Sequence, residues 1–391
     1  MRSARPRVGL LVRCCFIGAL ALSACGQPAA TTTVPVHRAS PKPVSTAVPT
    51  VTPEPSPSPT PTAPPLPVAI GIHVPAGFRA FNYAEGIYQP TAMAFGPDGR
   101  LYIASAAGHV SVVDTPGATP RLLVSGLPPT LGLAWRDDRL FVAVRGSVVA
   151  YTLTGNQLAG GAPVVSGLPG GEHQVDNLLM LGNGDFLLGV GSTCDLCVES
   201  DARSASVLRF HADWSYDGIV LRGSRNPYGL ANRLGTGTTY VTINGQDALG
   251  AAQPADELVE VRDGEDAGWP RCWPAFPTGI LYGSCSGVTA PVAVFAPHAS
   301  ADGIVFYEAA QFGPDYLDNA FVTEWGTYFG TGTGRKVVRV VMRQTNGPER
   351  GQVTDFATGF QHPLPVMVGP DGGLLVGDYG SGRIYEIRRL G

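Results

Sequence analysis

Charged residues are scarce in this chain: they make up 15% of its 391 residues, where about 25% is usual. Helix-compatible sequence is also limited, because 51 glycines and 35 prolines occupy about 22% of the chain against roughly 12% in average proteins. Inside a helix, Gly costs about 1 kcal/mol and Pro about 3 kcal/mol. Helical bundles, coiled coils and polytopic helical membrane proteins are therefore excluded, and a turn-rich all-β protein with some disordered sequence is expected.

The N-terminus reads MRSARPRVGLLVRCCFIGALALSACG, with four arginines followed by an apolar stretch that ends at Leu22. A basic start, a short apolar stretch and small residues before a cleavage site are typical of a secretory signal. Leu22-Ser23-Ala24-Cys25 resembles the lipobox of bacterial lipoproteins, in which Cys25 would be lipidated and become the new N-terminus. We expect a signal peptide over residues 1–24 and a protein exported and lipid-anchored to the membrane at its extracytoplasmic face. An ordinary cleaved signal peptide with a chance cysteine is the alternative.

Basic residues are too few to favour a nucleic-acid partner. Cleavage after Ala24 would take four of the 27 basic residues and none of the 31 acidic ones, which leaves a net charge of −8. Affinity for nucleic acid comes from Lys and Arg contacts with phosphates. Nucleic acid is therefore excluded as an expected partner.

Residues 25–67 contain no Phe, Tyr or Trp and consist mostly of Pro, Thr, Ser, Ala and Val. Such a segment cannot bury enough apolar surface to offset the entropy lost on ordering. Its prolines favour an extended spacer of about 3.1 Å per residue. We expect a disordered tether that holds the folded residues 68–391 away from the membrane.

Four cysteines remain once those of the signal peptide and the expected anchor are set aside: Cys194, Cys197, Cys272 and Cys285. An even number in an exported domain indicates two disulfides. Close spacing favours Cys194 with Cys197 and Cys272 with Cys285, although four cysteines allow three pairings. A zinc site at the C-x-x-C is the alternative, but the second pair has the wrong spacing and lacks paired histidines.

A strand-turn-strand pattern recurs six times after residue 67. Its clearest copies, residues 91–114 and 365–387, each contain an apolar run, a Pro-Asp-Gly turn, a second strand, a small polar turn and a third strand. Weaker copies occupy residues 131–153, 177–193, 229–245 and 301–325. The mean period is about 54 residues, slightly above the 40 to 50 of a β-propeller blade, and insertions at about 194–206 and 262–300 account for the excess.

The repeats predict an all-β, six-bladed β-propeller over residues 68–391. Residues 77–87, GFRAFNYAEGI, are expected to join the C-terminal blade and close the ring without an exposed edge. A pair of β-sandwiches is the alternative, but it does not explain the repetition. Propeller sites usually lie at one mouth of the central channel, on loops from several blades.

Two polar segments interrupt the blade pattern with catalytic residue types. In LPGGEHQVDN, His173 lies in a glycine-rich loop between Glu172 and Gln174, where a histidine can act as a base near neutral pH. In GSRNPYGLA, Arg225 precedes the Asn226-Pro turn and could present a planar fork of donors to a carboxylate or an oxyanion. Taken singly, each residue could equally have an ordinary structural role.

A third segment is rich in oxygen ligands. Asn244, Asp247, Asp256 and Glu257 supply hard oxygens, and turns rich in backbone carbonyls suit calcium, which takes roughly 6 to 8 oxygens. Solvated acidic loops are the alternative interpretation. The segment thus indicates a possible metal site next to the two polar segments.

Together and in this order, the segments resemble the glucose/sorbosone dehydrogenase family, soluble six-bladed propellers that use pyrroloquinoline quinone (PQQ) and calcium. The resemblance covers most of residues 70–388. The features that carry it are Gly-Phe-Arg with Tyr-Ala-Glu-Gly at 77–86, the His173 loop, Cys-x-x-Cys before VLRF, RNPYGLA, Asp-Glu at 256–257, Gly-Trp-Pro at 268–270, and PHASADGIVFY with His298 and Asp302.

The resemblance implies that a sugar hemiacetal or alcohol is oxidised by hydride transfer to the quinone. His173 would be the general base, Arg225 would stabilise developing negative charge and contact the cofactor, and Asn226 would contact the quinone. Gln174 and Lys336 are further candidates for cofactor binding. The expected partners are a small sugar substrate and the membrane, reached through the lipid on Cys25.

Calcium, in the same resemblance, would act as a Lewis acid on the quinone carbonyl. The candidate ligands are Gly245 and Gln246, through their backbone carbonyls, with Asp256 and Glu257.

Near the C-terminal blade, however, the chain reads GFQHPLPVMV where the family has arginines for the cofactor carboxylates. A non-catalytic propeller lipoprotein that binds carbohydrate or a partner protein is therefore the alternative.

Overall fold

The computed structural model describes residues 65–391, apart from residues 328, 330, 331 and 346. The expected signal peptide, Cys25 and all but the end of the expected tether lie outside the described residues. The folded part belongs to a compact unit that spans Ala63–Gly391. The helix within the described residues is a single 3-10 turn, η1 (Pro314–Tyr316), so no helix there is long and apolar enough to cross a bilayer.

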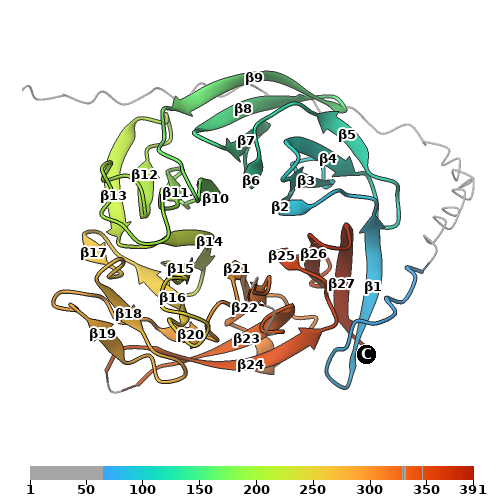
Figure 1. The fold of residues 1–391 in the computed structure, drawn as a ribbon. Coiled ribbons are helices and arrows are strands. Elements are labelled where there is room, and N and C mark those ends of the chain that lie inside the picture. Colours follow the sequence, from blue (N-terminus) through green and yellow to red (C-terminus); the bar gives the residue numbers. More distant parts are fainter. Residues whose placement is uncertain (1–64, 328, 330–331, 346) are drawn as a thin grey trace, which may run out of the picture. The chain divides into compact units, whose positions relative to one another are not determined.

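The strands form six antiparallel sheets arranged in a ring (Figure 1). The first sheet contains β2 (Pro90–Phe95), β3 (Leu101–Ser105), β4 (His109–Val113) and β5 (Arg121–Val124). The second contains β6 (Thr130–Arg136), β7 (Arg139–Val144), β8 (Ser147–Thr154) and β9 (Gln157–Ser166). The third contains β10 (Val175–Met180), β11 (Phe186–Val190), β12 (Ser206–Phe210) and β13 (Tyr216–Arg222).

The other three sheets complete the ring. The fourth contains β14 (Asn226–Arg233), β15 (Thr238–Asn244), β16 (Asp256–Val261) and β20 (Ala293–Phe295). The fifth contains β21 (Ala301–Tyr307), β22 (Asn319–Glu324), β23 (Lys336–Arg343) and β24 (Arg350–Thr358). In the sixth, β25 (Pro363–Val368), β26 (Leu374–Asp378) and β27 (Arg383–Arg389) pair with β1 (Phe78–Glu85).

The six sheets form a closed ring, held by contacts between innermost strands and by the pairing of the N-terminal strand with the last blade. Each innermost strand contacts the innermost strand of the next sheet, from β2 through β6, β10, β14, β21 and β25 back to β2. The seam is the antiparallel pairing of β1 with β27, from Phe78 opposite Arg389 to Glu85 opposite Arg383. The predicted six-bladed propeller is confirmed, including the N-terminal strand that completes the last blade.

The predicted turns form as their chemistry requires. Between β2 and β3, Gly99 has a φ of 75°, a left-handed conformation that glycine adopts without steric cost, and its N–H bonds the Gly96 carbonyl. The equivalent Gly372 between β25 and β26 has a φ of 87° and bonds Gly369 in the same way. Both copies of Pro-Asp-Gly therefore make tight links between first and second strands.

The core lies between neighbouring blades. Every residue of β3 and of β11 is buried, because each sheet is covered on both faces. One cluster, for example, packs Phe141 of the second blade against Phe186 and Trp214 of the third. Two-sided burial explains why the middle strands have apolar runs rather than the alternation typical of a half-exposed strand.

The two insertions differ from each other. Residues 194–205 form no strand, whereas the second insertion holds β17 (Glu265–Asp266), which extends the third sheet, and the hairpin of β18 (Cys272–Pro274) and β19 (Leu281–Gly283). Its end, β20, is the fourth strand of the fourth blade. The prediction that 262–300 lies outside the blade pattern is therefore wrong at residues 293–295, since the hairpin interrupts the blade before its outermost strand.

Candidate functional site

A polar cavity of about 440 Å³ lies at the mouth of the channel where the innermost strands begin. Asn226 is the first residue of β14, and Ser300 directly precedes β21. Of the predicted site residues, His173, Arg225, Asn226, Gly245 and Asp256 line this cavity. The residues that line the cavity are Glu172, His173, Arg225, Asn226, Asn244, Gly245, Asp247, Asp256, His298, Ser300, Gly326, Thr327 and Phe329.

The ring of His173 is held in one tautomer. Its Nδ1 lies 3.0 Å from Ser192 Oγ, and this hydroxyl donates its single proton to the Cys194 carbonyl, 2.7 Å away. Since the hydroxyl can only accept from the histidine, Nδ1 carries the ring proton. Nε2 has no hydrogen-bond partner among the described residues and keeps a free lone pair.

The same histidine is kept neutral. Burial, reinforced by the positive charge of Arg225, lowers the pKa of His173 to about 4, because both disfavour the imidazolium form. A neutral ring with an unpaired Nε2 lone pair is competent to accept a proton from a hydroxyl in the cavity. The arrangement provides what the prediction of a general base requires.

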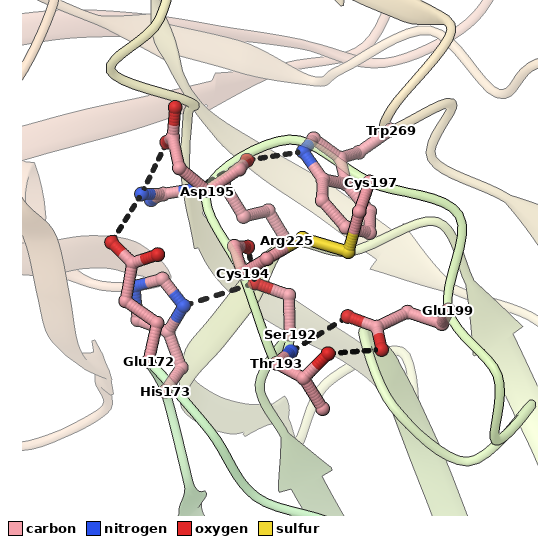
Figure 2. Close-up of a disulfide and its surroundings, with 10 residues drawn as sticks. All are labelled: Glu172, His173, Ser192, Thr193, Cys194, Asp195, Cys197, Glu199, Arg225 and Trp269. Atoms are coloured by element: carbon pink, nitrogen blue, oxygen red, sulfur yellow. Dashed lines mark hydrogen bonds and ion pairs between the residues drawn. A yellow bond between two sulfur atoms is a disulfide. The ribbon is translucent and has the colours of Figure 1, made fainter.

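Arg225 is buried beneath the cavity, with 4% of its side chain exposed. Its Nη2 lies 2.8 Å from Asp195 Oδ1 and 3.9 Å from Glu172 Oε1 (Figure 2). The same nitrogen lies 3.3 Å from Asp247 Oδ2. Its Nη1 donates to the Gly245 carbonyl at 2.7 Å. The guanidinium is thus fixed by protein partners, and its charge is shared with three carboxylates.

Asn226 is oriented by a chain of amides. Its Nδ2 donates to Asn244 Oδ1 at 2.8 Å, and Asn244 Nδ2 donates to the Ala301 carbonyl at 3.0 Å. Asn226 Oδ1 is buried without a hydrogen-bond partner among the described residues. A buried unpaired acceptor is costly. This oxygen lies near Asp176 Oδ2, since a Cβ on Gly191 would be 3.1 Å from the first atom and 3.3 Å from the second.

His298 differs from His173 in its contacts. Its Nδ1 lies 3.0 Å from Asp247 Oδ1 and its Nε2 lies 2.9 Å from the Gly250 carbonyl. Both ring nitrogens therefore have a protein partner, and neither is free toward the cavity. His298 also has a φ of 58°, a strained conformation typical of functional sites. No role for this residue followed from the sequence beyond its place in a motif.

Buried acids lie behind the cavity, and sequence reasoning missed their part in the site. Burial raises the pKa of Asp176 well above its usual value, with a further contribution from Asp302. Burial likewise raises the pKa of Asp302 and of Tyr228. Asp176 Oδ2 and the Tyr228 hydroxyl are buried without hydrogen-bond partners among the described residues. The sequence feature that could have identified these groups is the presence of polar residues near the starts of β10, β14 and β21.

The predicted metal ligands do not converge. Asp256 and Glu257 are neighbours on β16, and successive strand side chains point to opposite faces; Asp256 lines the cavity and Glu257 does not. Both oxygens of Asp256 accept backbone N–H groups, from Gly245 and Ala301. The Gly245 carbonyl accepts from Arg225. Gln246 is buried but is not part of the cavity lining.

The acidic groups that do converge are Glu172, Asp195 and Asp247, whose nearest oxygens all lie within 4.8 Å of one another. Burial raises the pKa of Asp256 to about 6 and that of Glu257 well above its usual value. Glu257 is buried on β16 and lies outside the cavity lining. Of the three converging acids, the sequence pointed to Glu172 and Asp247, while Asp195 was not among the candidates.

Lys336 and Gln174 lie apart from the cavity lining. Lys336 Nζ pairs with Asp355 at 2.6 Å and with Glu324 at 3.7 Å beside a different cavity of about 300 Å³, which does not support its predicted cofactor contact. Its neighbour Arg335 is exposed and packs against Gly326 in the polar cavity. Gln174 Oε1 accepts from Arg145 Nε at 2.9 Å.

The structure has both disulfides in the pairing that close spacing favours, Cys194–Cys197 and Cys272–Cys285. The first encloses Asp195 beside the cavity (Figure 2). The second closes the β18–β19 hairpin, with Cys272 at its start and Cys285 just after it. Neither pair is available as a zinc site.

Comparison with known proteins identifies the fold. No family model matches the chain, and an uncharacterized protein of Borreliella burgdorferi is 21% identical over 345 residues, covering 81% of this chain and 90% of that protein. The holo PQQ domain of pyranose dehydrogenase from Coprinopsis cinerea superposes with a TM-score of 0.71 at 16% identity, over 81% of this chain and 97% of that domain.

Two further solved structures have the same architecture. A calcium structure of a carbohydrate-active enzyme of family AA12 from Trichoderma reesei has a TM-score of 0.71 at 17% identity, covering 83% of this chain and 98% of that one. The PQQ-bound aldose sugar dehydrogenase of Streptomyces coelicolor has a TM-score of 0.63 at 20% identity, covering 83% and 99%. The chain has the fold of these proteins. At these identities the likeness establishes the fold. Any function has to be inferred from the residues of the site.

Proposed function

We propose that this protein is a PQQ-dependent dehydrogenase that oxidises a sugar hemiacetal or alcohol in the polar cavity, exported and anchored to the membrane through Cys25. The observation that carries the proposal is His173, which is neutral, fixed in its tautomer by Ser192 and free at Nε2. Two similar structures are of PQQ-bound or holo sugar dehydrogenases.

The cavity suits a polyanionic cofactor only together with a cation. PQQ carries three carboxylates, whereas Arg225 already faces Glu172, Asp195 and Asp247, so the tricarboxylate alone would be repelled. The converging carboxylate oxygens are hard ligands of the kind that calcium prefers. A calcium ion held by these acids would offset their charge, while Arg225 and Arg335 supply positive charge for the cofactor carboxylates.

The chain's own residues then define the proton chemistry. A quinone in the cavity would supply a two-electron acceptor for the hydride that leaves the sugar carbon. His173 Nε2 accepts the hydroxyl proton of that carbon as the carbonyl forms, and the ring becomes an imidazolium hydrogen-bonded through Nδ1 to Ser192. Arg225 lies close enough to act on His173 electrostatically, and it favours return of the proton to solvent.

The direct test is the variant His173→Gln in the full-length chain. Oxidation of a panel of aldoses, followed by dye reduction with PQQ and calcium present, is expected to fall at least about 100-fold, in the range lost with a general base. PQQ binding, followed by quinone absorbance, is expected to stay within about twofold. The exposed His211 is the matched control, and His211→Gln should keep full turnover.

The pH profile gives a second test of the same base. Since the pKa of His173 is lowered to about 4, kcat/KM should rise with pH through this value and show no further rise from His173 near its usual pKa of about 6.5. A rise centred near neutrality, or unchanged turnover in His173→Gln, would show that the base is misassigned.

A non-catalytic carbohydrate-binding propeller is the second candidate, favoured by the placement of Lys336 in another cavity and by the three carboxylates around Arg225. Titration of the full-length chain with PQQ, with and without calcium, separates the two. Binding at micromolar PQQ that is lost on calcium removal supports the dehydrogenase. Absence of binding in both conditions, with retained sugar binding, supports the non-catalytic function.

A further inference from the structure

One short loop reaches both key side chains of the site. Ser192 accepts the Nδ1 proton of His173, and Asp195, three residues later, binds Arg225 (Figure 2). The loop has no regular strand or helix between residues 191 and 205. Its shape therefore depends on the bonds that it makes, and the disulfide Cys194–Cys197 lies at its centre.

Asp195 is the main attachment point of this loop. Its Oδ1 accepts from Arg225 Nη2 at 2.8 Å and from the backbone N–H of Asp247 at 2.7 Å, and its Oδ2 accepts from the N–H of Ala248 at 2.9 Å. Its carbonyl accepts from Trp269 Nε1 at 3.1 Å. One residue thus joins the loop to Arg225 and to two neighbouring segments of the fourth blade.

The disulfide encloses Asp195 between its two half-cystines. The Cys194 carbonyl is also the group that takes the Ser192 proton and so sets the direction of the His173 contact. Downstream, Glu199 closes the loop by accepting from the N–H of Thr193 at 2.6 Å and from its hydroxyl at 2.7 Å. The covalent ring therefore fixes the carbonyl that orients His173 and the carboxylate that fixes Arg225.

We infer that the disulfide-closed loop Cys194–Cys197 is a positioning element that holds His173 in its Nδ1–H tautomer and Arg225 in place, and that opening the disulfide releases both. The inference rests on the proposed function for the role of His173, but not for the contacts. Both cysteines are half-buried, and the adjacent Leu196 and Val198 are 47% and 89% exposed. The bond is therefore accessible to a dithiol.

The second disulfide provides a matched control. Cys272 is 2% exposed, and neither it nor Cys285 bonds to His173, Ser192 or Arg225 in the structure. Because a disulfide that closes a longer loop constrains the unfolded chain more, its removal should cost at least as much global stability as removal of Cys194–Cys197. The two pairs separate a local positioning effect from general destabilisation.

The test follows the ring nuclei of His173 by NMR in the full-length chain, assigned with His173→Gln. Wild type should show the Nδ1–H tautomer, which the Ser192 hydroxyl selects. In Cys194→Ser/Cys197→Ser the tautomer signals should shift toward the Nε2–H form. Cys272→Ser/Cys285→Ser should match wild type.

Two further measurements test the inference even if the double variant folds poorly. Dithiothreitol reduces the disulfide of wild type to two thiols and is itself oxidised to its cyclic disulfide, with transfer of two electrons and two protons; the same NMR change should follow and should reverse on reoxidation. Ser192→Ala should change the tautomer with the disulfide intact. An unchanged His173 signal in the reduced wild type would overturn the inference, whether or not the protein proves to be a dehydrogenase.

Discussion

Gly191 marks the closest approach of the backbone to the proposed base. A Cβ at this position would lie 2.4 Å from His173 Cβ and 3.1 Å from Asn226 Oδ1, and the first distance is shorter than real Cβ contacts. Neither neighbour is the free end of a long side chain. Only glycine therefore lets β11 pass close enough to β10 for Ser192, the next residue, to reach the His173 ring.

Gly191→Ala is expected to destabilise the protein by about 1–3 kcal/mol, as overpacking of a filled site does, and to displace His173 from Ser192. Turnover of Gly191→Ala should fall together with its stability. Gly182→Ala is the control, because a Cβ at Gly182 meets no atom within 4 Å. Urea unfolding and dye reduction check both. Equal stability and activity in the two variants would show that the approach at Gly191 is not tight.

At the residue scale, the sequence predicted the chemistry better than the contacts. His173, Arg225 and Asn226 were predicted and do line one cavity, because the starts of the innermost strands meet at one mouth of a propeller. Lys336 was predicted to contact the cofactor but lies beside a different cavity, whereas its neighbour Arg335 packs against Gly326 of the polar cavity. Asp256 lines the cavity and Glu257 does not, as the alternation of strand side chains would place them. The contacts of Ser192 became visible only in three dimensions.

Strand β1 is the element on which closure of the ring depends, because it comes from the N-terminal end of the folded unit and completes the C-terminal blade. Phe78 anchors its start. Phe78 is 8% exposed. Its phenyl group makes edge contacts with Phe312 and Phe356, with centroid distances of 4.8 Å and 5.4 Å. The next residue, Arg79, points to solvent on the same strand.

Phe78→Ala should lower the free energy of unfolding by about 3–5 kcal/mol, the usual range for removal of a buried aromatic ring. Arg79→Ala, one position away, should change it by less than about 0.5 kcal/mol. Chemical denaturation of both variants measures the difference. Similar small losses would mean that the seam contributes little to the stability of the ring.

At the element scale, strand repetition and Pro-Asp-Gly turns predicted all six blades and the seam. The outermost strands were harder, and β20 was placed in an insertion. Strand β20 has three residues and follows the separate β18–β19 hairpin. The repeat spacing therefore does not indicate its position. Outer strands pack on one neighbour fewer than middle strands, and their sequence is correspondingly less constrained.

Across the whole molecule, several carboxyl groups are buried. Burial raises the pKa of Glu324 and of Glu386 to about 7 and that of Asp176 well above its usual value. A carboxyl with a raised pKa stays protonated in the folded state while the unfolded chain has already ionised. The folded state then binds more protons than the unfolded state, so stability is fully present at low pH and is lost as pH rises. His173, whose pKa is lowered, acts in the opposite direction between its lowered value and its usual one.

The effect of Asp176 can be isolated with Asp176→Asn, which resembles the protonated acid in shape and cannot ionise. Above about pH 4, the usual pKa of an aspartate in the unfolded chain, the free energy of unfolding of wild type should fall more steeply than that of the variant, by up to about 1.4 kcal/mol per pH unit for one proton. The variant should therefore gain on wild type as pH rises from about 4, with the two curves parallel below that pH. The exposed Asp138 provides the control, because Asp138→Asn should run parallel to wild type. Parallel curves for Asp176→Asn as well would mean that Asp176 is ionised in the folded protein and that the acids behind the cavity carry full negative charge.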